Sequence, residues 1–144
     1  MRGRLLRLYW LMVGPAAALF AVLYALGAAG GVSGHRWVEA HPWLGPVIFF
    51  TAAALGIAGP LALRTAFVSA HRTASAIGED ELRRFEERQM LVALWTPYLA
   101  VAAAYLELPG VLFVGTVLSA FYALYYFYPS ERRISYERRI FRVR

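Results

Sequence analysis

The segment WLGPVIFFTAAALGIAGPLALRTAFVSA, residues 43–70, is apolar over almost its whole length and decides the structural class of this protein. About 20 mostly apolar helical residues, rising 1.5 Å each, cross a membrane hydrocarbon core of roughly 30 Å. Because lipid offers no hydrogen bonds to the backbone, a single segment can satisfy its own backbone groups there only as a helix. Residues 43–70 are therefore predicted to form a transmembrane helix.

Three further apolar runs, residues 6–29, 90–106 and 108–128, predict three more spans. The run 90–106 is long enough only if the polar turns before it belong to the same helix, which gives a span over about 80–106. Hydrophobic residues make up 60% of the 144-residue chain and charged residues 17%, whereas about a quarter of a soluble domain is charged. We therefore expect an all-α integral membrane protein, a single domain over 1–144 with four transmembrane helices in a bundle.

The arginines predict how this bundle is oriented. They gather before the first run, between residues 64 and 88, and after residue 130, whereas the segment that joins the first two runs holds only Arg36. Positive charge marks the cytoplasmic side of a membrane. Both termini and residues 71–89 are therefore expected in the cytoplasm, and the chain in the inner (plasma) membrane. The tail, 130–144, is predicted to be a basic amphipathic segment on the anionic inner leaflet.

The polar segment HRTASAIGEDELRRFEERQ, residues 71–89, is interpreted as a link followed by the start of a helix. Gly78 marks the boundary between the link and the helix. The acidic residues 79–81 suit a first helical turn, because the helix dipole favours anions there. Charge pairs four residues apart support a solvated helix. These pairs are Glu79–Arg83, Asp80–Arg84 and Arg83–Glu87. We predict a link over 71–78 and an unbroken helix over about 80–106.

Two other patterns concern helix shape and packing. Pro15, Pro60 and Pro97 each interrupt a span, where each removes an intrahelical hydrogen bond and favours a kink. Two pairs of small residues four positions apart predict close approach of helix backbones, within the chain or between subunits. They are Ala52 with Gly56 and Gly115 with Ser119.

Several kinds of site are argued against by composition and topology. The chain has no cysteine, which excludes disulfides and thiolate metal centres. His35 and His41 are expected on the opposite side of the membrane from His71, so no shared metal is predicted. The net charge of +6 follows the topology and does not indicate a nucleic-acid partner. No charged residue is placed at the bilayer centre, which argues against an ion relay and disfavours a transporter.

The segment AHRTASAIGEDELRRFEERQMLVALWTPYLAVAAAYLELPG, residues 70–110, is similar to the bacterial branch of the MAPEG family, membrane-associated proteins in eicosanoid and glutathione metabolism. The similarity covers about residues 62–130. It rests on Arg72, Gly78, Leu82, Arg84, Arg88, Gln89, Pro97, the Leu106–Glu107 pair, Gly115 and the tyrosines at 122, 125 and 128. The resemblance implies a trimeric helical bundle with ligand pockets between subunits near the cytoplasmic face. The ligand-binding residues it implies are Arg64, Arg72, Arg84, Arg88, Gln89 and Tyr125.

Two leucines separate this chain from the family's chemistry. Leu91 and Leu94 stand where the family has an Asn and an acidic residue that help to bind glutathione. We therefore expect a non-enzymatic structural or accessory membrane component, either a homo-oligomer or a subunit of a larger membrane complex. The alternative is a MAPEG-like trimer that binds a lipid or a glutathione-type ligand near the cytoplasmic leaflet, possessing or lacking transferase activity.

Overall fold

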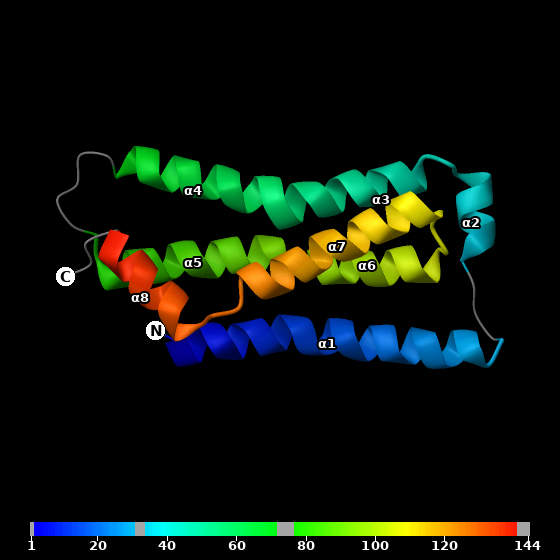
Figure 1. Ribbon diagram of the computed structural model, residues 1–144, viewed down its shortest axis with the longest axis horizontal. Coiled ribbons are helices and arrows are strands. Elements are labelled where there is room, and N and C mark those ends of the chain that lie inside the picture. Colours follow the sequence, from blue (N-terminus) through cyan, green and yellow to red (C-terminus); the bar gives the residue numbers. More distant parts are fainter. Residues whose placement is uncertain (1, 31–33, 72–76, 141–144) are drawn as a thin grey trace.

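The computed structural model describes residues 2–30, 34–71 and 77–140, and within them every regular element is helical. The first long helix is α1 (Arg2–Ala28). The next rod contains α3 (Leu44–Ala53), a π-helical turn η1 (Ala54–Ala58) and α4 (Gly59–Ala70). It is followed by α5 (Glu79–Ala93) and α6 (Thr96–Tyr105), and then by α7 (Gly110–Tyr126). The short helix α2 (His35–Ala40) lies across one end of these rods and α8 (Glu131–Ile140) at the other (Figure 1).

The helices confirm an all-helical chain that is suited to a membrane. Within the described residues, α1 and the continuous helix Leu44–Ala70 are long and apolar enough to cross a bilayer. The number of such helices rises to three if α7 and the start of α8, which are bent by 75° relative to each other, count as one span. The prediction of four transmembrane helices goes beyond this and stays a prediction.

The predicted unbroken helix over 80–106 is wrong, although its start near residue 80 is right. The structure ends α5 at Ala93 and begins α6 at Thr96, and Leu94 between them has left the helical conformation with φ −77° and ψ 2°. The cause is Pro97, which has no N–H to donate to the carbonyl of Ala93 and whose ring clashes with the carbonyl four residues before it in a continuous helix.

The other two interior prolines do not break their helices. Pro15 lies inside the continuous α1, and at Pro60 the rod continues through η1, where the Gly59 N–H bonds to the Ala54 carbonyl five residues back. Both prolines follow a glycine. A glycine has no Cβ for the proline ring to meet, so the helical conformation before the proline is tolerated.

The two pairs of small residues pack against other helices of the same chain. A Cβ added to Gly56 would lie 3.2 Å from the Ser119 carbonyl oxygen of α7 and 3.2 Å from Oγ1 of Thr96 in α6. A Cβ added to Gly115 would overlap the ring of Phe49. The predicted close approach of helix backbones is therefore confirmed at Gly56, where η1 meets α7, whereas Gly115 makes room for the side chain of Phe49 in α3.

The first turns of α5 are not a solvated helix, which corrects the prediction for 80–89. Leu82 and Phe85 are buried together with Ile77, against partly buried side chains of α4. The rings of Phe85 and Phe67 stack with centroids 4.0 Å apart. Because α5 presents one face to α4, only the opposite face of this polar segment meets solvent.

The charge pairs on that exposed side are partly as predicted. Arg83 pairs with Glu87 at 3.8 Å, as expected, and more closely with Asp80 at 3.0 Å. Arg84 donates from Nε to the Asp80 carbonyl oxygen at 3.3 Å. These contacts hold the start of α5 locally and leave Arg84 exposed.

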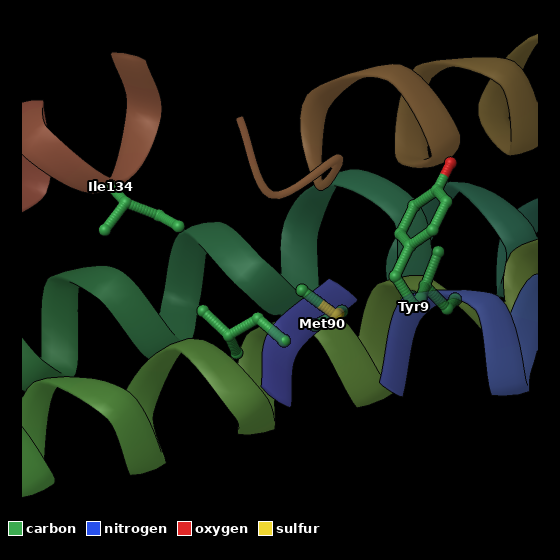
Figure 2. Close-up of a cluster of buried hydrophobic side chains, with 5 residues drawn as sticks. Tyr9, Met90 and Ile134 are labelled. Atoms are coloured by element: carbon green, nitrogen blue, oxygen red, sulfur yellow. The ribbon is translucent and has the colours of Figure 1, made fainter. Parts of the chain in front are cut away.

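One hydrophobic cluster joins the beginning, the middle and the end of the described chain. It consists of Leu5 and Tyr9 of α1, Met90 and Leu94 at the end of α5, and Ile134 of α8 (Figure 2). The Tyr9 hydroxyl donates to the Leu124 carbonyl oxygen at 3.0 Å, because its ring lies against α7. The tail therefore docks on the bundle through Ile134, and only part of α8 remains available to a lipid surface. Residues 141–144 of the predicted tail lie outside the described residues.

Candidate functional site

A large open groove lies at the arginine-rich end of the bundle, where the start of α1, the end of α7 and α8 come together (Figure 1). Its volume is about 920 Å³, at the upper end of the range of about 300–1,000 Å³ that is usual for ligand pockets. We call it the basic groove. It is lined by Tyr9, Arg64, Phe121, Leu124, Tyr125, Tyr126, Tyr128, Ser130, Arg132, Arg133, Tyr136 and Glu137.

Two arginines of the basic groove are held in place by neighbours. Arg64 of α4 lies with Nη1 3.2 Å from Oε1 of Glu137, which is buried in α8. Its Nη1 also lies 3.4 Å from the Tyr126 hydroxyl. Arg133 stacks over the Tyr126 ring, with 5.5 Å between guanidinium and ring centroid, and donates from Nη1 to the Tyr126 carbonyl oxygen at 3.0 Å. Both side chains are therefore set before any ligand arrives.

Arg132 is the groove's readily available cation. It is exposed, and in the described part of the chain no carboxylate lies within ion-pair distance of its guanidinium. Three arginines and one carboxylate thus line the basic groove, so its net charge is positive. Such a surface attracts an anion, and a guanidinium can bind a phosphate or carboxylate through two parallel hydrogen bonds.

A buried polar cluster underlies this groove. Glu86 of α5 is 2% exposed and Glu137 of α8 is 6% exposed. Glu86 interacts electrostatically with Arg133, Arg64 and Glu137, and its Oε1 has no hydrogen-bond partner among the described residues. Two carboxylates therefore lie among two arginines in a region removed from water, where charges are tolerated only when compensated. The cluster ties α4, α5 and α8 together.

The structure brings together three of the six residues that the resemblance implies. Arg64 and Tyr125 line the basic groove. Gln89 lies beside it, because a small cavity of about 90 Å³ is lined by Gln89, Arg64 and Tyr126. The Gln89 side-chain amide donates to the Pro60 carbonyl oxygen at 2.9 Å, so it is already engaged in joining α5 to α4.

The other three implied residues are placed differently. Arg84 and Arg88 are exposed on α5 and are not among the described residues that line the basic groove. Arg72 lies outside the described residues.

Sequence reasoning missed Arg133 and Glu137, because the tail was interpreted as a basic segment on the inner leaflet, and it also missed Tyr126 of α7. One signal was available: Glu137 is three residues after Ile134, so both share a helix face. An acidic residue on the apolar face of a basic helix indicates a partner on the protein.

The histidines lie at opposite ends of the bundle, as predicted. His35 and His41 flank α2, whereas His71 follows α4 at the arginine-rich end (Figure 1). His71 Nδ1 lies 2.9 Å from the Phe67 carbonyl oxygen, and Nε2 lies 2.8 Å from Oε1 of Glu81. The first contact, and then the second, raises the pKa of His71 above its ordinary value, since both favour the doubly protonated ring. Among the described residues, no three His, Asp or Glu side chains converge as a metal site.

Comparison of the chain with models of protein families, with curated proteins and with solved structures found no match. The resemblance to the MAPEG family therefore stays a prediction. The basic groove and the buried charges beneath it are the features that bear on function.

Proposed function

We propose that this chain is a non-catalytic, multi-pass protein of the inner (plasma) membrane, a structural or accessory component that holds an anionic lipid headgroup at its cytoplasmic end. The observation that carries the proposal is the basic groove, which is lined by Arg64, Arg132 and Arg133, by one carboxylate and by several tyrosines. Tyrosine is typical of the membrane–water interface, because its ring is apolar and its hydroxyl is polar.

The position of the groove supports a headgroup as the ligand. The start of α1, the end of α4, the start of α5 and α8 share one end of the bundle (Figure 1), and that end carries most of the arginines. The arginine rule predicts that it faces the cytoplasm. The inner leaflet supplies anionic lipids there, and each basic residue near such a surface contributes about 1 kcal/mol.

The glutathione alternative has less support from the arrangement of side chains. Arg84 and Arg88 are exposed on α5, away from the groove that holds Arg64 and Tyr125. Leu94, at a position where the resembled family is polar, is fully buried in the hydrophobic cluster. An apolar side chain at this position provides no hydrogen bond for a tripeptide. Lipid binding without transfer chemistry is therefore the function that we propose.

The partners that we propose are the lipid bilayer and either further copies of this chain or a larger membrane complex. Large apolar side chains such as Phe50, Leu61 and Val111 are exposed along the rods. In a membrane these side chains face lipid or another protein. Native mass spectrometry of one preparation reads both the number of copies and the bound lipids.

The experiment is a lipid competition on the purified full chain. We expect native mass spectra in mixed phosphatidylglycerol and phosphatidylcholine to show retained phosphatidylglycerol. Arg132→Gln should weaken that retention about tenfold, since a hydrogen bond to a charged group contributes about 1.5–3 kcal/mol. Arg36→Gln, an exposed arginine of α2 at the other end of the bundle, is the matched control and should retain the lipid. Equal retention of the two lipids by the unmodified chain would contradict the proposal.

A further inference from the structure

A second groove lies next to the basic groove, between α1, α6 and α7. Its volume is about 350 Å³, and every described residue that lines it is apolar. Small side chains form much of its wall, among them Ala17 of α1, Ala100 of α6 and Ala120 of α7. We call it the apolar groove.

The two grooves meet. Phe121 and Leu124 of α7 line both of them. A ligand that follows α7 therefore passes from the arginines and tyrosines of the basic groove directly to a wall without polar groups. This change from charged to apolar along one path matches a molecule with an anionic head and a hydrocarbon tail.

The dimensions of the apolar groove select among possible occupants. Along α7 it extends from Phe113 to Leu124, which is about 16 Å at 1.5 Å per residue. This length is about half of a hydrocarbon core of roughly 30 Å, the depth of one leaflet. A volume of about 350 Å³ spread over that length leaves a cross-section of roughly 20 Å². A partner helix of about 10–12 Å diameter has a much larger cross-section.

We propose that the two grooves form one binding site for an anionic phospholipid of the inner leaflet. The headgroup phosphate binds at Arg132 and Arg133, and one acyl chain lies between α1 and α7 against α6. This inference rests on the headgroup binding proposed above and adds the place of the acyl chain. Ala120 lines the apolar groove and is buried. A larger residue in the wall of this groove would fill the space that the acyl chain needs.

The test separates the tail from the head. Ala17→Phe places a ring in the apolar groove from an exposed position of α1, and Ala18→Phe, its exposed neighbour outside the groove, is the matched control. Binding is measured for long-chain phosphatidylglycerol and for its water-soluble dihexanoyl analogue. We expect Ala17→Phe to reduce long-chain retention about tenfold and to leave dihexanoyl binding unchanged, whereas Ala18→Phe changes neither.

The experiments distinguish failure of the acyl-chain site from failure of headgroup binding. If Arg132→Gln lowers binding of both lipids but Ala17→Phe lowers neither, the acyl-chain site is wrong and headgroup binding stands. If Arg132→Gln lowers neither, headgroup binding itself fails. A phosphatidylglycerol with a photoreactive diazirine in its acyl chain gives a measurement on the unmodified protein. Crosslinks should fall within residues 13–20, 97–101 and 113–124, and crosslinks confined to α3 and α4 would overturn the inference.

Discussion

The side chain of Glu137 is a carboxylate that is almost entirely buried. It lies on α8, on the same face as Ile134, and Arg64 of α4 is its ion-pair partner. A buried ion pair gives little net stability relative to an apolar pair, yet removal of one partner is costly because the other charge stays buried. The pair therefore specifies where α8 docks.

We expect Arg64→Ala to lower the free energy of unfolding by about 1–3 kcal/mol, because Glu137 is left buried without its partner. Thermal unfolding in detergent measures this change. Arg88→Ala removes an exposed arginine of α5 and should change stability by no more than about 0.5 kcal/mol. Equal effects of the two substitutions would show that the ion pair does not hold α8.

The contacts of His71 with Phe67 of α4 and Glu81 of α5 predict that the stability of the protein depends on pH. The pKa of His71 is raised above its ordinary 6.5, first by the Phe67 carbonyl and then by Glu81. A raised pKa means that the folded state binds the proton more tightly than the unfolded state. The stabilisation is therefore fully present below pH 6.5 and is lost as the pH rises through the raised pKa.

The measurement is the difference in thermal stability between the unmodified chain and His71→Gln. This difference should shrink as the pH rises from about 6 to about 8. Glu81→Gln removes one of the two acceptors and should make the trend smaller. A difference that grows with pH would show that the ring is not stabilised in its protonated form.

At the scale of the elements, hydropathy predicted most of the helices and missed how they are interrupted. The apolar runs 6–29, 43–70 and 108–128 correspond closely to α1, to the rod Leu44–Ala70 and to α7. The break before Thr96 was missed, because hydropathy does not show whether an interior proline is accommodated in a helix or breaks it. A separate tail after residue 130 was predicted, but the 75° angle between it and α7 was not, since hydropathy contains no information on angles.

The candidate site was likewise predicted only in part. Arg64 and Tyr125 were found through a family resemblance and lie in one groove. Arg133 and Glu137 were missed because their positions follow from the docking of α8, and no short-range spacing contains that information. Local patterns predict an element, whereas a site made by four elements requires their packing.

The crossing of η1 and α7 at Gly56 predicts an unequal response to the same substitution. Gly56→Leu must push Ser119 or Thr96 away, so we expect a loss of about 1–3 kcal/mol from overpacking. Gly27→Leu is the matched control, because nothing lies within 4 Å of a Cβ at Gly27 in α1 and the next residue is not a proline. It should leave the stability unchanged or slightly higher, since glycine is a poor helix former. Thermal unfolding of both variants in one detergent gives the comparison.

At the scale of the whole molecule, the arrangement in Figure 1 makes the proposed orientation testable. The chain has no cysteine, so a single introduced cysteine is the only labelling site. Ala40→Cys at the end of α2 and Gly78→Cys before α5 are both exposed and lie at opposite ends of the bundle. A maleimide that cannot cross the membrane should label Ala40→Cys in intact cells.

Gly78→Cys should react with this maleimide only after the membrane is permeabilised, because its end of the bundle is predicted to be cytoplasmic. The reverse pattern would overturn the orientation. Labelling of both positions in intact cells would contradict the placement of the two positions on opposite sides of the membrane.

The cluster that joins Leu5 to Ile134, together with the ion pair between Arg2 and Glu131, also sets a time order for assembly. Arg2 and Glu131 are 129 positions apart, and a ribosome that adds about 5–20 residues per second needs roughly 6–25 s to make that stretch. During this interval the start of α1, which is predicted to lie on the cytoplasmic side, is without the helix that covers it. α1 is thus the first helix to be made and among the last to be fully packed. Until α8 has been made, Leu5 is covered only by groups that do not belong to α8.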